Sequence, residues 1–358
     1  MKNKAIIIDE FSRLGGGQMT AYNIVKALSE KYDFDLITDG MHSNLDKKLF
    51  KNVIETSYNY FEGISFMKIL GGIVRTRKEL NEINDKISKD LTINNHPNMF
   101  LFDADINFIH VFFLMEAMDR WNKKDSAFAL LVKLSGIYKL YKHSHFVVAG
   151  RYMETMGKKE YRYLGISPQV NVIPYPILYP NTVDFLTKQD VVLTFGRINQ
   201  DKELETVMKI AKNTTTKFII AGSVNKGSEK YLNFLHTIKP TNVSILSNPS
   251  EEEKVMLFKR AKVYLHTRRN ENYGLSVAEA IGYGCIPVVP KSGGPWIDIV
   301  EQGKYGYGYD TVNEATDIIQ EAFKTPSNNY REIYDSRHRF SFKRFKNELE
   351  TLTSQFLM

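Results

Sequence analysis

The chain has 358 residues, which is long enough for two domains because single hydrophobic cores stop growing at roughly 250–300 residues. Its hydrophobic content of 43% and charged content of 25% are ordinary for a soluble globular protein. The net charge of +7 suits an anionic ligand, an anionic membrane surface or solubility alone. No dense basic stripe interleaved with aromatic residues occurs, which argues against nucleic acid as a partner.

The cysteine count and the length of the apolar runs indicate where in the cell the protein is expected. Cys285 is the only cysteine, so an internal disulfide framework is excluded and a reducing cytoplasm is favoured. No apolar run approaches the roughly 18 residues of a membrane-spanning helix, and we expect none. The expected location is the cytoplasm, with the cytoplasmic face of a membrane left open.

The first half of the chain begins with a predicted βαβ unit. An apolar strand over residues 5–9 is followed by a glycine turn, a helix over 18–31 and a second strand over 34–38. This order predicts a parallel sheet with right-handed crossovers. Later strands of the same sheet are predicted at 105–111, 145–149 and 170–173. Residues 1–180 are therefore expected to form a Rossmann-like domain.

The pattern restarts after a proline-containing linker at about residues 175–189. The predicted strands cover 190–195, 217–221, 242–246, 263–266 and 286–289, and the predicted helices cover 203–212, 251–261 and 315–324. A second Rossmann-like domain is expected over 188–338, with a last helix within 339–358 that packs back on the first domain. The predicted fold class is α/β, with two doubly wound domains facing across a cleft and ligands at the carboxyl ends of the strands.

Three consecutive glycines, Gly15, Gly16 and Gly17, separate the first strand from the first helix. Glycines at such a turn let the backbone approach a phosphate, and the helix N-terminus adds N–H donors. The dinucleotide fingerprint is not met, because its third glycine would fall on Thr20. A phosphate loop and an ordinary tight turn are equally good explanations of this segment alone.

A basic pair, Arg197 and Lys202, flanks the turn after the predicted strand at 190–195. A guanidinium forks onto phosphate oxygens and an ammonium adds a point charge, so the pair could neutralise a diphosphate. The alternative is a solvated loop with two ordinary cations. Their place at the carboxyl end of a strand favours the first interpretation.

Two glutamates, Glu271 and Glu279, lie eight positions apart around a predicted helix start near Leu275. The backbone N–H groups of Gly274 and Leu275 are expected to face phosphates. Carboxylates accept hydrogen bonds from hydroxyls, so Glu279 suits a ribose and Glu271 suits a sugar. The alternative makes Glu271 a helix cap and Glu279 a surface residue. For a glutamate pair considered alone, this alternative is the better explanation. The basic pair at 197 and 202 shifts the balance towards a sugar nucleotide.

One histidine, His110, follows the apolar residues 106–109 and is expected at the carboxyl end of a strand. It could donate to a sugar hydroxyl, although a buried core histidine is the more common outcome. His143 and His145 have no partners at metal-ligand spacing, and no Asp-x-Asp pair occurs. We therefore expect no metal and no cofactor besides a nucleotide-sugar co-substrate.

These segments, in this order, resemble the retaining glycosyltransferases of family 4, which have the GT-B fold. The E-x7-E block of that family is matched by Glu271 and Glu279, with Gly274 and Pro287 in register. Other matches are the strand-end Gly196-Arg197 with Lys202, the loop Gly15–Gly17, His110, the segment Gly150-Arg151-Tyr152 and the loop Ser292-Gly293-Gly294-Pro295. The nearest subgroup in appearance is the α-1,2-mannosyltransferases that extend dolichol-linked oligosaccharides. The chain departs from it in being shorter, in lacking an N-terminal membrane anchor and in carrying Asp298 near a common glutamate.

The resemblance implies a metal-independent, retaining hexosyl transfer from a donor of the GDP-mannose or UDP-glucose type to a glycan, glycolipid or lipid-linked acceptor. It implies an acceptor-binding first domain and a donor-binding second domain. Arg197, Lys202, Glu271 and His110 would act in the reaction. Gly15, Gly16, Gly17, Gly274, Leu275 and Glu279 would bind substrate.

Three alternative functions and one separate hypothesis remain. A nicotinamide-dependent oxidoreductase is disfavoured by Thr20, and a phosphorylase of the same fold lacks a recognisable pyridoxal lysine segment. A catalytically idle subunit that binds sugar nucleotides is disfavoured by the intact motifs. Separately, the segment from Lys133 to Lys142 mixes basic, aromatic and apolar residues and could contact a membrane, although an ordinary surface helix is about twice as good an explanation.

Overall fold

The computed structural model describes residues 2–11, 15–42, 45–56, 66–97, 102–110, 112 and 123–357. Side chains are not described at 66–74, 123–128 and 137. Val111, the last residue of the strand predicted over 105–111, lies outside the described residues. Met1 and Met358, at the ends of the predicted domains, lie outside them as well.

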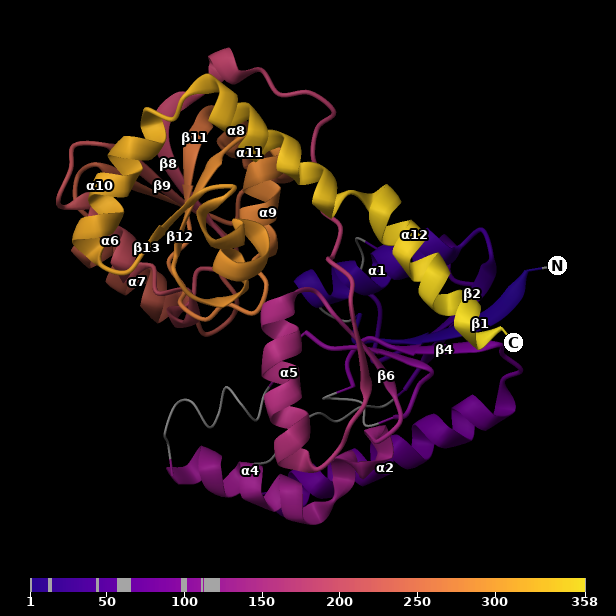
Figure 1. Ribbon diagram of the computed structural model, residues 1–358. Helices are drawn as coiled ribbons and strands as arrows, with labels where there is room; N and C mark the ends of the chain where they lie inside the picture. The colour runs from indigo at the N-terminus through magenta and orange to yellow at the C-terminus, as the bar shows by residue number, and fades with distance from the viewer. Residues whose placement is uncertain are drawn as a thin grey trace. The chain divides into compact units, whose positions relative to one another are not determined.

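The chain divides into two compact units (Figure 1). Unit 1 comprises Met1–Pro176 and Phe342–Met358, and unit 2 comprises Ile177–Ser341. The division falls within the proline-containing segment and just before the last long helix. Each unit is built around one parallel sheet.

The sheet of unit 1 has the order β3-β2-β1-β4-β5-β6-β7, and every pair is parallel. Its strands are β1 (Asn3–Ile8), β2 (Tyr32–Thr38), β3 (Asn52–Glu55), β4 (Leu91–Asn94), β5 (Ile106–Phe108), β6 (His145–Val148) and β7 (Gln169–Val172). Its helices are α1 (Gly16–Leu28), α2 (Phe66–Lys86), α4 (Lys123–Ser135), α5 (Arg151–Leu164) and α12 (Phe342–Thr353). The order reverses at β1, so the carboxyl ends of β1 and β4 mark the switch point at which ligands bind in such sheets.

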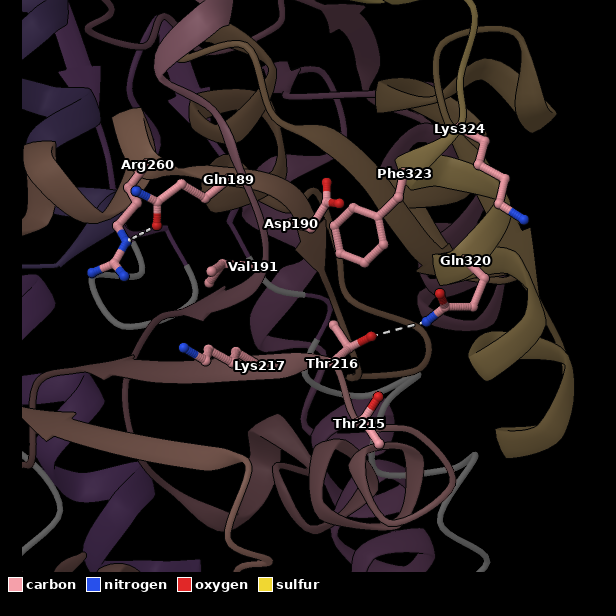
Figure 2. A pocket seen from close by; sticks show the side chains of 10 residues that line it. All are labelled: Gln189, Asp190, Val191, Thr215, Thr216, Lys217, Arg260, Gln320, Phe323 and Lys324. Atoms are coloured by element: carbon pink, nitrogen blue, oxygen red, sulfur yellow. Dashed lines mark hydrogen bonds between the residues drawn. The ribbon is translucent and has the colours of Figure 1, made fainter.

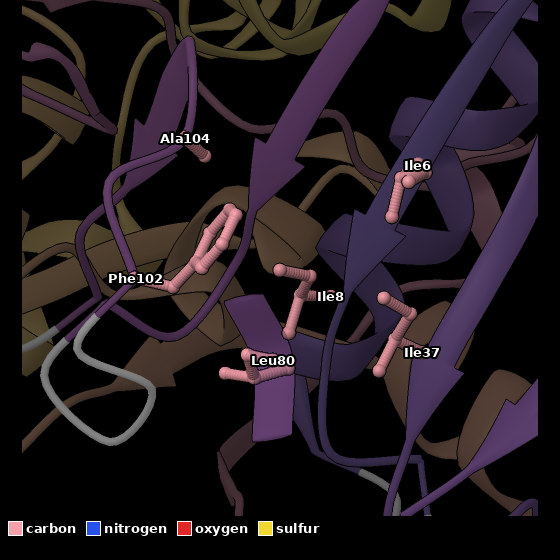
Figure 3. Packing of buried hydrophobic residues seen from close by; sticks show 6 residues of the cluster. All are labelled: Ile6, Ile8, Ile37, Leu80, Phe102 and Ala104. Atoms are coloured by element: carbon pink, nitrogen blue, oxygen red, sulfur yellow. The ribbon is translucent and has the colours of Figure 1, made fainter. Parts of the chain in front are cut away.

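Apolar side chains on β1 and β2 pack with α2 to form one core of unit 1 (Figure 3). Ile6, Ile8, Ile37 and Leu80 are fully buried in it. Phe102 and Ala104, which precede β5, complete the cluster. This burial fixes β1 in the middle of the sheet, and so fixes the loop that follows it.

The last helix, α12, lies beside α1, as Figure 1 shows in yellow and indigo. Lys346 Nζ pairs with Glu30 at 2.7 Å, and Lys31 Nζ pairs with Glu350 at 3.2 Å. Phe345 and Leu349 are buried on the same helix. The C-terminal segment therefore returns to the unit that the N-terminal segment begins.

The sheet of unit 2 has the order β10-β9-β8-β11-β12-β13 and is parallel throughout. Its strands are β8 (Gln189–Phe195), β9 (Lys217–Gly222), β10 (Val243–Ser247), β11 (Ala261–Leu265), β12 (Ile286–Pro290) and β13 (Tyr307–Tyr309). Its helices are α6 (Glu205–Ala211), α7 (Glu229–Ile238), α8 (Glu251–Arg260), α9 (Leu275–Gly282), α10 (Val312–Phe323) and α11 (Ser327–Asp335). The switch point lies between β8 and β11.

The fold class predicted from the sequence, two doubly wound α/β domains, is confirmed. The first helix begins at Gly16 and not at residue 18, because Gly15 in extended conformation is already its N-cap. Several elements were not predicted, among them β4, β13, α2 and α7. The missed strands β3, β4 and β13 have four, four and three residues, too few to show a period.

Candidate active site

The side chains of Lys202 and Glu271 form an ion pair at the switch point of unit 2. Lys202 ends a short 3-10 turn, Gln200–Lys202, that follows β8, and Glu271 lies in the loop between β11 and α9. Arg268 Nη1 lies 3.4 Å from Glu271 Oε1, and His266 Nε2 lies 3.9 Å from Glu271 Oε2. Both predicted motifs of this unit thus meet at one carboxylate.

The basic side chains around Glu271 set the pKa of its carboxyl group. Burial by itself would raise the pKa of this carboxyl, but Lys202, His266 and Arg268 outweigh burial and lower the pKa to about 2. Burial lowers the pKa of His266 to about 4, so its ring is neutral near neutral pH. The Nε2 atom of His266 is buried and has no hydrogen-bond partner in the described structure. The Glu271 carboxylate therefore lies between the side chains of Lys202 and Arg268.

The backbone around Glu271 is held by the loop Ser292-Gly293-Gly294-Pro295. Gly294 N–H donates to the carbonyl of Glu271 at 2.8 Å. A Cβ on Gly293 would lie 2.7 Å from that same carbonyl oxygen, and Gly293 has φ of +76°. Only glycine allows this approach. The two segments, 22 positions apart, therefore depend on each other.

Helix α9 begins at Leu275, where the sequence predicted it. Its N-cap is Gly274, with φ of +94°, and no side chain caps it. Glu271 is therefore not a helix cap, which removes the alternative explanation of that residue. The first N–H groups of the helix are left for other acceptors.

Glu279, inside α9, is paired with a lysine that the sequence did not single out. Lys254 Nζ, on α8, donates to Glu279 Oε1 at 3.2 Å. Only 23% of the Glu279 side chain is exposed, so it is not an ordinary surface residue. Burial raises the pKa of Glu279, and Lys254 opposes that rise. The lysine thus opposes the neutralisation of this buried carboxyl and orients it.

Arg197 follows Gly196 at the end of β8, with its side chain exposed. It lines a cavity of about 20 Å³ together with Lys202, His266 and Ser276. The backbone here is tightly packed, since a Cβ on Gly222 would lie 1.5 Å from the Gly196 carbonyl oxygen. β8, β11 and α9 thus bring Arg197, Lys202 and the neighbourhood of Glu271 together.

The remaining predicted site residues, Gly15, Gly16, Gly17 and His110, belong to unit 1. A Cβ on Gly17 would lie 3.4 Å from His110 Cδ2, so the glycine turn and this histidine are neighbours. Burial lowers the pKa of His110 to about 3. A second histidine, His96, lies equally close to Gly17 and was not predicted. It follows β4, the strand that the sequence did not reveal.

A larger hollow of about 480 Å³ lies elsewhere in unit 2, at the amino ends of β8 and β9 (Figure 2). Its lining includes Gln189, Lys217, Arg260 and Phe323. None of the predicted site residues contributes to it. Volume alone is therefore a poor guide to the chemistry of this unit.

Within the described ranges, no three His, Cys, Asp or Glu residues are grouped so that they could hold a metal ion. No helix of the described part of the chain combines the length and apolar character needed to cross a bilayer.

Known structures share this architecture over nearly its full length. The sucrose-phosphate synthase of Thermosynechococcus elongatus superposes with a TM-score of 0.76 at 14% identity, covering 99% of each chain. HepE of Anabaena, solved with UDP and glucose, superposes with a TM-score of 0.70 at 15% identity, covering 98% of this chain and 100% of that one. The chain has the GT-B fold of glycosyltransferases.

The family comparison concerns unit 2. Residues 179–341 match the family model of glycosyl transferases group 1. The chain is 35% identical over 107 residues to the GDP-Man:Man(3)GlcNAc(2)-PP-Dol alpha-1,2-mannosyltransferase of Dictyostelium discoideum. That match covers 28% of this chain and only 20% of the length of the relative.

Proposed function

We propose that this protein is a retaining, metal-independent glycosyltransferase that moves a hexose from a nucleotide-diphosphate sugar to a hydroxyl of a glycan or lipid-linked acceptor. The observation that carries the proposal is the contact between Lys202 and Glu271. It joins the two motifs that the sequence assigned to phosphate and to sugar, inside a glycosyl transferase group 1 domain. A donor of the GDP-mannose type is favoured by the matched mannosyltransferase, and UDP-glucose by the ligands of HepE.

In the proposed complex, unit 2 binds the donor. Arg197 and Lys202 hold the diphosphate, helped by the free N–H groups at the start of α9. Glu279 accepts hydrogen bonds from the ribose diol, and Glu271 from hydroxyls of the transferred sugar. The four residues surround one switch point, which is where doubly wound sheets bind nucleotides.

The proposed reaction breaks the bond between C1 of the sugar and the diphosphate. Arg197 and Lys202 stabilise the charge that develops on the leaving diphosphate, which is electrostatic catalysis. The acceptor hydroxyl attacks the same face of an oxocarbenium-like sugar and passes its proton to the leaving phosphate oxygen. No protein nucleophile is required. Gly15–Gly17 and His110 of unit 1 are proposed to contact substrate, with unit 1 binding the acceptor.

A thermal-shift screen of GDP, UDP and their sugars tests donor binding, because a ligand that binds only the folded state raises its stability. Turnover of the stabilising donor is then measured with and without a chelator. We expect turnover that chelation does not affect and an α-configured product from an α-configured donor. Binding without turnover for any acceptor would instead support the alternative of a catalytically idle subunit.

A membrane-bound acceptor is a second proposal, favoured by the surface of α4. Leu130, Leu131 and Leu134 are 50%, 43% and 72% exposed, and Lys133 lies among them. Exposed leucines beside lysines match the apolar and anionic layers of a membrane interface. We propose that this helix rests on the cytoplasmic face of an anionic membrane.

A further inference from the structure

Four polar side chains of unit 1 form one connected network beside Gly17. Asp9, directly after β1, is fully buried and contacts His96 Nδ1 through its Oδ1 atom. Its Oδ2 atom accepts a hydrogen bond from Asn95 Nδ2 at 3.1 Å. Asn95 Oδ1 in turn lies 3.1 Å from His110 Nε2. The network spans the carboxyl ends of β1, β4 and β5.

Asn95 fixes the orientation of two neighbours at once. Its amide nitrogen also donates to the carbonyl of Gly17 at 3.0 Å, so both of its N–H bonds are used. The amide oxygen of Asn95 can only accept a hydrogen bond, so His110 must carry its proton on Nε2 to donate to it. The glycine turn and the tautomer of His110 thus depend on one buried amide.

His96 stands in a different electrostatic environment from His110. Burial by itself would lower the pKa of His96, but Asp9 outweighs burial and raises that pKa above its usual value, with Glu10 and Asp39 adding to the rise. Among the described residues, His110 also faces the ring, with ring centroids 5.3 Å apart, and its low pKa leaves it neutral near neutral pH. His96 also keeps 19% of its side chain exposed. It is the accessible member of the pair and the one that protonates more readily.

Because Asp9 holds Nδ1, the outward-facing atom of His96 is Nε2. A Cβ on Gly17 would lie 3.3 Å from that nitrogen, so Nε2 faces the glycine turn directly. When the ring is protonated, Nε2 carries a hydrogen and donates, and after deprotonation it can only accept. The Nε2 atom is thus a donor at low pH and an acceptor at high pH, while Nδ1 keeps its contact with Asp9.

We propose that His96 binds substrate by donating from Nε2 to a substrate oxygen at the glycine turn, with Asp9 as its positioning residue. Asn95 is a positioning residue for His110 and for Gly17. The inference rests on the proposed glycosyl transfer and adds a binding residue to it. The role requires the protonated ring, so transfer should fall as the pH rises through the titration of His96.

The kinetic test compares the full-length wild type with His96→Gln, Asp9→Asn and the control His236→Gln, which changes an exposed histidine of α7 in unit 2. The kcat/KM for the donor is measured from about pH 5.5 to about pH 9. We expect the alkaline limb to vanish in His96→Gln, with about a tenfold loss at the optimum. We expect it to move to lower pH in Asp9→Asn and to stay in the control. An alkaline limb that is the same in wild type and in His96→Gln overturns the inference.

Histidine NMR of the substrate-free protein separates this inference from the proposed function. The signal that is lost in His96→Gln is the signal of His96. The variant Asp9→Asn tests whether the Asp9 carboxylate raises the titration midpoint of His96. A midpoint above the free value of about 6.5 that drops in Asp9→Asn supports the inference, and a midpoint at or below 6.5 overturns it. If Asp9→Asn does not fold, the assigned midpoint still decides. A wild type that turns over no donor counts against the proposed function and leaves this titration result standing.

Discussion

Lys202 and Glu271 form an ion pair across 69 positions of the chain, and each has a proposed role towards the same donor. In the ligand-free protein the cation and the carboxylate neutralise each other. A bound diphosphate would pair with Lys202 in place of Glu271. Glu271 would keep Arg268, which lies 3.4 Å away, as its partner. On this proposal, donor binding would be an exchange of ion pairs that leaves no charge buried and alone.

Lys202→Met should lower kcat by about 10²–10³-fold, because it removes a charge that stabilises the leaving diphosphate. Steady-state turnover of the donor identified by thermal shift measures this effect. Lys209→Met changes an exposed lysine of α6 and should leave kcat unchanged. Equal rates in both variants would contradict the role of Lys202.

Lys254→Met should raise the KM for the donor by about tenfold, because Glu279 loses the hydrogen-bond partner that orients its carboxyl group and opposes its neutralisation. The kcat should change little, since the ribose is remote from the reacting bond. Lys259→Met, on the same helix but exposed, is the matched control. A loss confined to kcat would speak against a ribose-binding role of Glu279.

The low pKa of Glu271 predicts that acid lowers the free energy of unfolding. Its folded pKa of about 2 is below the reference value of 4.5, so it stabilises the fold above pH 4.5 and loses that contribution as the pH falls towards 2. The contribution is at most about 3 kcal/mol. Denaturant unfolding of wild type and Glu271→Gln should give free energies that differ near neutral pH and converge in acid. A difference that does not depend on pH would refute this.

Gly222→Ala should destabilise unit 2 by about 2–4 kcal/mol, because the new methyl group would lie 1.5 Å from the Gly196 carbonyl oxygen. The shift would also displace Arg197 and reduce turnover. Gly227→Ala is the control, since Gly227 has φ of +94° but no atom within 4 Å of its Cβ position. It should cost only about 1 kcal/mol of backbone strain. Thermal unfolding compares the two variants.

Leu134→Glu should weaken sedimentation with anionic liposomes, because it places a negative charge on the proposed membrane face of α4. Leu186→Glu in unit 2, where the leucine is 95% exposed, should have no effect. Neutral liposomes should bind less of the wild type than anionic ones. Wild type that stays in the supernatant with both lipids would reject the membrane proposal.

Much of unit 2 could be predicted from local sequence. Strand and helix periods gave the order of unit 2, and Gly274 before an apolar helix marked the start of α9. The sites of unit 1 were harder, because β4 has only four residues, all of them buried. With that strand unrecognised, Asn95 and His96 could not be placed at a strand end, and His110 was the residue predicted there.

The sequence by itself determined the fold class and the residues proposed to meet phosphate and sugar, because periodicity, glycine positions and motif spacing are local properties of the chain. Only the tertiary structure decided the partners of those residues. Lys254 for Glu279, Lys202 for Glu271 and Asp9 for His96 are separated by 25, 69 and 87 positions. Parallel strands bring such residues to one edge of a sheet through long crossovers, and no local pattern records which side chains meet there.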